Sequence, residues 1–152
     1  MMQIEKRLEE LNIQLPVPPS PIANYTACKQ VGNLVFVSGQ GPIIDGKQLF
    51  TGKVGDAVSQ EDAYQAARCC AINLIAQLKR FLGDLDKVKQ VAHLKGYVAS
   101  ANSFTAQPSV INGASDLMVE LFGDAGIHTR CALGVNVLPT DIPVEVELIV
   151  EV

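Results

Sequence analysis

Hydrophobic positions recur with two different periods along the chain. Apolar residues follow a helical spacing between Ser59 and Gly83, which are suited to cap a helix at its two ends. A second helix is predicted from Pro108 to about Phe122, with Gly123 as its stop. Alternating patterns predict strands at 25–31, 34–38, 88–99, 130–138 and 144–152. The resulting order, strand-strand-helix-strand-helix-strand-strand, indicates an α+β domain of two layers with both helices on one face of the sheet.

The first part of the chain has a different character. Residues 4–11 suggest a short amphipathic helix, and the stretch Pro16–Pro21 contains four prolines, which exclude helix and inner strand. We therefore divide the chain into an N-terminal helix and proline-rich arm (1–21) and a main domain (22–152). The opening residues are charged and lack the apolar core of a secretory signal, so a cytoplasmic location is expected. The apolar runs are too short for a membrane span, which needs about 20 residues.

Composition narrows the function classes. Hydrophobic residues make up 48% of the 152 positions and charged residues 18%, which excludes disorder and favours an oligomer that hides surface against its own copies. The net charge of −4 and the absence of a basic block argue against nucleic acid as the main partner. The four cysteines lack metal-ligand spacing, and with only two histidines no metal site is expected. Buried, reduced thiols are the simplest interpretation.

The last two strands carry the candidate chemistry. Alternation predicts that Arg130, Asn136, Glu145 and Glu147 share the helix-free face of the sheet, while Cys131 points into the core. Two interpretations stay open at this point. The charges could form an ion pair that sets register or subunit contacts, or the guanidinium could bind a carboxylate while a glutamate positions or deprotonates a water. His128 is expected to be a strand-edge or loop histidine that could alter the charge of this pocket as it titrates.

Several motifs resemble the RidA (YjgF) family. Arg130 is followed by Leu138-Pro139 and by a glutamate-containing strand, as in the C-terminal signature of that family. The segment 34–40 ends in Ser-Gly-Gln, as does the family's N-terminal strand. Tyr25 and Glu145 stand at the spacings of the family's active-site tyrosine and water-orienting glutamate, and Asn112 stands where the family has an asparagine. The resemblance covers about residues 22–152.

The resemblance implies a chorismate-mutase-like fold with a mixed sheet, and a homotrimer whose helix-free sheet faces close a central barrel. It also implies hydrolysis of 2-imino or 2-enamino acids to 2-keto acids and ammonia in clefts between subunits, with no cofactor or metal. Arg130 would bind the carboxylate, helped by backbone amides around Gly39 and Cys131, and Glu145 would orient the water. The cleft would be lined by Tyr25, Phe104 and Asn112.

Departures from the family pattern keep two other functions in view. The cysteine that usually stands two residues after the arginine is Ala132 here, and the Gly-Pro that usually precedes the tyrosine is Ala23-Asn24. These changes favour a divergent branch with an extended N-terminus. A trimeric protein that binds a small carboxylate metabolite without turnover is therefore the alternative. Endoribonuclease action, a label that the family also carries, is the weakest of the three because the chain is acidic and its basic residues are dispersed.

Overall fold

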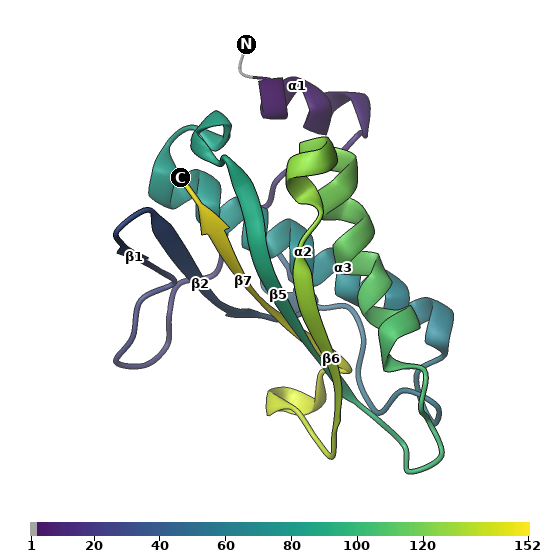
Figure 1. Cartoon of the computed structure of the whole chain (residues 1–152). Helices are drawn as coiled ribbons and strands as arrows, with labels where there is room; N and C mark the ends of the chain where they lie inside the picture. The colour runs from purple at the N-terminus through teal and green to yellow at the C-terminus, as the bar shows by residue number, and fades with distance from the viewer. Residues whose placement is uncertain (1–2) are drawn as a thin grey trace.

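The computed structural model describes residues 3–152 and consists of a sheet layer, a helix layer and a short outer helix (Figure 1). The helices are α1 (Gln3–Glu10), α2 (Gln60–Leu82) and α3 (Gln107–Phe122), and the 3-10 turns are η1 (Leu85–Lys87), η2 (Gly123–Gly126) and η3 (Pro139–Asp141). The strands are β1 (Cys28–Val31), β2 (Leu34–Gln40), β3 (Ile43–Ile44), β4 (Lys47–Gln48), β5 (Gln90–Ala99), β6 (Thr129–Val135) and β7 (Val144–Glu151). The predicted α+β class and element order are confirmed.

The main sheet has the strand order β1-β2-β7-β5-β6. Strands β5 and β6 are parallel and all other neighbours are antiparallel, so the predicted mixed sheet is confirmed. A parallel pair needs a long crossover connection, which α3 supplies. The hairpin between β1 and β2 turns at Gly32-Asn33 as predicted, with Gly32 at φ 61°. Strands β3 and β4 form a separate hairpin that is too short to show alternation in the sequence.

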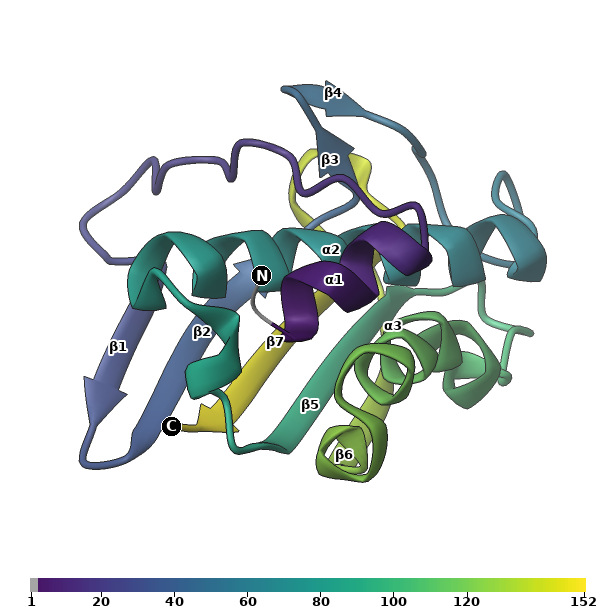
Figure 2. The same cartoon turned by 90° about the horizontal axis from the view of Figure 1, so that it is seen from above.

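The predicted helix ends are confirmed. The Ser59 hydroxyl accepts a hydrogen bond from the backbone N–H of Asp62, and Gly83 ends α2 in the left-handed conformation with its N–H bonded to the carbonyl of Lys79. Pro108 stands in the first turn of α3, and Gly123 caps its end. These two helices cover one face of the sheet and leave the other face bare (Figure 2). The core lies between the layers, where the row Val144, Val146, Leu148 and Val150 of β7 is at most 1% exposed.

The predicted faces of β6 are wrong. Arg130 pairs with the buried Leu94 of β5 in parallel register, and paired residues in a sheet point to the same side, so Arg130 faces the helices. Cys131 is exposed on the helix-free face instead of lying in the core, and Leu133 on the same face is 45% exposed. Asn136 lies beyond the end of β6, where its Oδ1 accepts a bond of 2.9 Å from Lys53 Nζ. The row was misassigned because the more apolar row of this edge strand is the one that the helices leave uncovered.

The remaining face assignments hold. Glu145 and Glu147 lie on the helix-free face, because they alternate with the buried valines of β7. Glu147 is bonded there by Tyr97 Oη at 3.4 Å and paired with Lys95 Nζ at 3.5 Å. The charges of Glu147 are therefore partly matched by β5, and Arg130 takes no part in this cluster.

The N-terminal helix and the arm pack on the helix layer of their own chain (Figure 2). Leu8 of α1 is 5% exposed and belongs to the core. The Asp86 carboxylate accepts the backbone N–H groups of Gln3 and Ile4, and these bonds lower the pKa of Asp86. The arm is attached to α2, since Gln77 Nε2 donates to the carbonyl of Pro19 at 2.8 Å. The arm is thereby fixed near the start of β1.

Candidate functional site

Arg130 is held against the N-terminal half of α3 by three neutral acceptors. Its Nη1 donates to Asn112 Oδ1 at 2.8 Å and to Ser115 Oγ at 3.1 Å, and its Nη2 donates to the carbonyl of Pro108 at 3.3 Å. Asn112 and Ser115 are three residues apart and therefore share one face of the helix. Within residues 3–152 no carboxylate forms an ion pair with Arg130. The guanidinium is oriented, yet its charge stays available to an anion.

A pocket of about 260 Å³ holds a second group of predicted site residues. It is lined by Tyr25, Gly39 and Glu145. The pocket opens where β2 ends. Its other walls include residues 19–22, where the arm meets the main domain, and Pro139, Thr140 and Ile142 of the β6–β7 connection. Tyr25 precedes β1 instead of lying in a strand, and its side chain is 55% exposed. Burial raises the pKa of Glu145, and the negative charge of Glu147 raises it further. A carboxyl group with a raised pKa beside a pocket is a candidate for proton transfer or for orienting water.

The fit between Gly39 and Glu145 is tight. A Cβ atom at position 39 would lie 2.9 Å from Glu145 Oε1 and 3.0 Å from its Cδ. The register of β2 against β7 is irregular between Val37 and Gln40, which places Gly39 at a bulge beside the carboxylate. Glycine at this position therefore makes room for the glutamate. The family resemblance implies that the backbone amide around Gly39 helps Arg130 to bind a carboxylate, whereas within one chain Gly39 lies beside Glu145.

Two predicted site residues lie elsewhere. Phe104 packs against Gly55, since a Cβ atom built on Gly55 would lie 2.9 Å from Phe104 Cβ, and it is not among the residues that line the Tyr25–Glu145 pocket. The side chain of Cys131 projects from the helix-free face, opposite to Arg130. The other three thiols are buried, and burial raises the pKa values of Cys28 and Cys69 to about 11. Thiols with such high pKa values are poor nucleophiles at neutral pH.

One chain does not bring Arg130 and Glu145 together. Arg130 is level with Leu94 and Glu145 with Tyr97, on strands that flank β5. Two strand spacings and three residues along the strands separate their Cα atoms by roughly 14 Å. The two side chains also point to opposite faces of the sheet. The ion pair between Arg130 and a β7 glutamate, one of the two interpretations that the sequence leaves open, does not form in the part of the chain that the structure describes.

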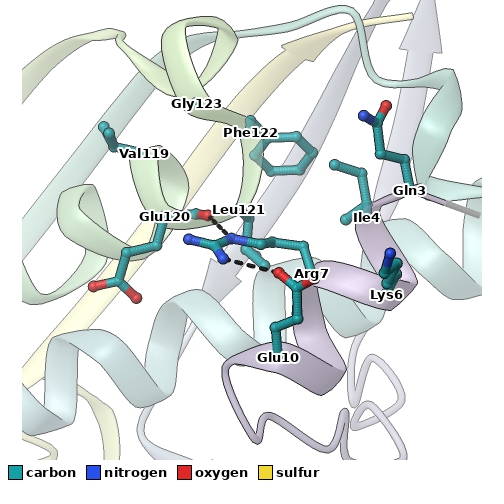
Figure 3. A pocket seen from close by; sticks show the side chains of 10 residues that line it. All are labelled: Gln3, Ile4, Lys6, Arg7, Glu10, Val119, Glu120, Leu121, Phe122 and Gly123. Carbon is teal, nitrogen blue, oxygen red and sulfur yellow. Dashed lines mark hydrogen bonds and ion pairs between the residues drawn. The ribbon is translucent and has the colours of Figure 1, made fainter.

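Another pocket, of about 510 Å³, lies between α1 and the end of α3 (Figure 3). Arg7 spans it, with Nε bonded to the carbonyl of Glu120 at 2.9 Å and Nη1 to Glu10 at 3.0 Å. None of the predicted site residues lines this pocket, which forms where α1 packs against the end of α3. In residues 3–152 no group of three or more His, Cys, Asp or Glu side chains could hold a metal ion. No helix of that range combines the length and apolar character needed to cross a membrane.

Comparison with known proteins identifies the family. The family described as "YjgF/chorismate mutase-like, putative endoribonuclease" matches residues 5–152. The chain belongs to the RidA (YjgF) family. The resemblance carried by Arg130, Glu145 and the Ser-Gly-Gln segment is thus confirmed over nearly the whole chain.

Relatives within the family carry different names. Protein TCP17 of Trypanosoma cruzi is 41% identical over 150 residues, which cover 98% of this chain and 94% of that protein. A 2-iminobutanoate/2-iminopropanoate deaminase of Dermatophagoides farinae is 29% identical over 139 residues, which cover 91% and 93% of the two chains. The crystal structure of "a putative endoribonuclease" from Shewanella oneidensis is 35% identical, covers 99% of both chains and has a TM-score of 0.96.

Sequence reasoning within this RidA family chain missed two residues. Ser115 contacts Arg130 from α3, and Gln77 lines the Tyr25–Glu145 pocket from α2 while holding the arm. Ser115 could have been found by its spacing from Asn112, since residues three apart share a helix face. Gln77 gives no such signal, because a single polar residue on an apolar helix face does not reveal which carbonyl it meets.

Proposed function

We propose that this protein hydrolyses 2-imino or 2-enamino acids to 2-keto acids and ammonia in a cleft between copies of the chain. The observation that carries the proposal is Arg130, an oriented guanidinium with three neutral acceptors and no ion-pair partner among residues 3–152. A guanidinium in this condition is suited to bind a carboxylate through a charge-assisted, bidentate pair. The deaminase named among the relatives supports the choice of substrate class.

The proposed reaction needs little acid or base strength from the protein. Water adds to the imine carbon, and the tetrahedral carbinolamine then collapses, breaking the C–N bond to release ammonia and leave the C=O group of the keto acid. Arg130 would hold the substrate carboxylate, and the Glu145 carboxylate would accept a hydrogen bond from the attacking water. Tyr25 would line the cleft beside them. The neutral fraction of Glu145, which its raised pKa increases, could return a proton to the leaving nitrogen.

The two halves of this site call for a second copy of the chain. Strands β6 and β1 are the two edges of the sheet, so a closed ring of copies would set the β6 edge of one copy beside the β1 edge of the next. Arg130 lies on β6, and Tyr25 lies three residues before the start of β1. The exposed apolar side chains Phe36 and Leu133 would be covered within the ring. We propose a homotrimer with the helix-free faces inside, located in the cytoplasm, where its free thiols would stay reduced.

The experiment is a coupled assay of imine hydrolysis. A pyridoxal-phosphate-dependent dehydratase or an amino-acid oxidase generates the imino acid in the presence of semicarbazide, and the protein should lower semicarbazone formation and accelerate keto-acid release. Arg130→Gln should abolish both effects. Arg68→Gln is the matched control. The Arg68 guanidinium already pairs with Glu120 at 2.7 Å, so this substitution should leave turnover intact. Equal activity of wild type and Arg130→Gln would refute the proposal.

Ala132 favours a second candidate, a protein that binds a small carboxylate without turnover. This residue shares the helix-facing row with Arg130 and offers no thiol where many family members have one. Keto-acid binding that depends on Arg130, without acceleration for any imine tested, would select this function. RNA cleavage is separated from both by binding at low and high salt, because phosphate contacts make affinity fall with salt. No RNA binding at low salt would remove it.

A further inference from the structure

A chain of hydrogen bonds leads from Arg130 to a fixed backbone carbonyl. Ser115 Oγ accepts from Arg130 Nη1 at 3.1 Å and lies 2.9 Å from His128 Nε2, and His128 Nδ1 lies 2.6 Å from the carbonyl of Gly126. The carbonyl can only accept, so Nδ1 carries the proton. In the neutral ring Nε2 is then an acceptor, and the Ser115 hydroxyl donates to it. This assignment directs the hydroxyl hydrogen away from Arg130 and turns a lone pair toward it.

The far end of the chain is rigid. A Cβ atom on Gly126 would lie 2.2 Å from the carbonyl oxygen of Met118, so η2 packs directly on the backbone of α3. Gly126 is buried within this contact. The ring of His128 is thus anchored to the same helix that presents Ser115 and Asn112. Arg130 is bound to α3 directly through these two side chains and indirectly through the histidine.

The donors that this arrangement leaves free are the ones a carboxylate needs. A guanidinium has five N–H groups. Asn112 and Ser115 occupy both N–H groups of Nη1, and the carbonyl of Pro108 occupies one on Nη2. The N–H group of Nε and one N–H group of Nη2 have no acceptor among residues 3–152. Loss of the Ser115 acceptor would free an Nη1 donor and allow the guanidinium to rotate away from this orientation.

We propose that Ser115 and His128 are positioning residues for Arg130, with His128 orienting the Ser115 hydroxyl and Ser115 fixing the guanidinium for carboxylate binding. This inference rests on the proposed role of Arg130. Neither residue touches the substrate, so their effect should fall on substrate affinity and not on the chemical step. Because both act through one chain of bonds, their effects should not add.

The test measures binding of 2-oxobutanoate by calorimetry, and KM and kcat in the imine assay, on the oligomeric protein. Ser115→Ala and His128→Leu should each raise Kd and KM roughly tenfold, the loss expected when a charged group loses one hydrogen bond, with kcat changed less than about twofold. Ser115→Thr keeps the hydroxyl, and His128→Gln offers an amide oxygen near the position of Nε2, so both should restore affinity. The double variant Ser115→Ala/His128→Leu should bind no more weakly than Ser115→Ala alone.

Two controls keep the result interpretable. His93→Leu removes the other histidine, which lies on the helix-free face and bonds Thr129, and it should leave Kd unchanged. Light scattering and thermal unfolding of every variant show whether assembly or fold is lost. If His128→Leu does not fold, Ser115→Ala and its hydroxyl-retaining counterpart Ser115→Thr, together with His128→Gln, still test the proposal.

Three outcomes are decisive. Wild-type affinity in Ser115→Ala and His128→Leu, with binding lost in Arg130→Gln, would overturn the positioning role and leave the proposed function standing. Fully additive losses in the double variant would overturn the single chain of bonds. Wild-type affinity in Arg130→Gln would instead refute the carboxylate-binding role on which both proposals depend.

Discussion

Gly39→Ala tests whether the place of the Glu145 carboxylate determines turnover. The new Cβ atom would lie 2.9 Å from Oε1, 3.0 Å from Cδ and 3.2 Å from Cγ of Glu145, whereas ordinary contacts begin at 3.4 Å. The backbone at Gly39 lies outside the left-handed region, so alanine itself is not strained there. The closest carboxyl atom, Oε1, must therefore retreat by about 0.5 Å from its present position.

The expected effect is large on the rate and small on stability. Displacement of a reacting group by 1 Å can cost about a hundredfold in rate, so a shift of this size should lower kcat roughly tenfold. The contact is made by the end of a side chain that can turn aside, at a cost of about 0.5–1.5 kcal/mol if Glu145 leaves its rotamer. The free energy of unfolding should fall by no more than that amount.

The assay is imine hydrolysis for kcat, together with thermal unfolding for stability. The control is the same substitution in a Glu145→Asp background, where the shorter side chain removes the Cδ and Oε1 contacts. Gly39→Ala should then change kcat little, so the two effects should be strongly non-additive. A tenfold loss in both backgrounds would show that the crowding acts on something other than the carboxylate. Wild-type kcat in the single variant would refute the argument that Gly39 makes room for a working glutamate.

Three further predictions concern pH, packing and assembly. Because the pKa of Glu145 is raised in the folded chain, its contribution to stability is lost as the pH rises through the unfolded and then the folded pKa. Glu145→Gln should therefore be more stable than wild type at neutral pH but not at low pH, as measured by chemical unfolding. A stability difference that stays constant with pH would contradict this. Gly113→Ala would put a Cβ atom 2.0 Å from the carbonyl oxygen of Tyr64 and force α2 and α3 apart. The free energy of unfolding should therefore fall by about 2 kcal/mol or more, despite the better helix propensity of alanine. An unchanged denaturation midpoint would show that the helices can separate freely. Leu133→Glu places a charge on the exposed apolar part of the helix-free face and should convert the proposed trimer to smaller species by light scattering, whereas an intact trimer would exclude Leu133 from the interface.

The parts of the fold that short-range chemistry determines could be predicted from the sequence. Ser59 and Gly83 mark the ends of α2 because a hydroxyl cap and a left-handed glycine satisfy the backbone groups that a helix leaves unpaired. Alternation likewise gave β7 correctly, since its valine row is continuous and fully buried. In these elements the local pattern and the tertiary environment agree.

The faces of β6 could not be predicted in the same way. Alternation tells which residues share a face, but it assigns the apolar row to the core only where a single face is covered. In β6 the exposed row contains Cys131 and Leu133, while the row toward the helices contains Arg130 and Ala132. The parallel register with β5 decides the question, and it depends on contacts between residues more than thirty positions apart. The family resemblance points to Arg130 whichever face it lies on, because the resemblance rests on spacing along the chain.

The separation of Arg130 from the glutamates has a consequence for ligand affinity. A guanidinium paired with an acid in its own chain would have to break that pair before it could bind a carboxylate. Glu145 on the opposite face cannot form such a pair, and neutral acceptors on α3 hold Arg130 in place without neutralising its charge. The Arg130 side chain is already ordered in the folded chain. Less conformational entropy is therefore lost when the ligand binds, and more of the interaction energy contributes to affinity. The proposed anion site would bind its ligand through the positive charge of Arg130, which the fold leaves unmatched.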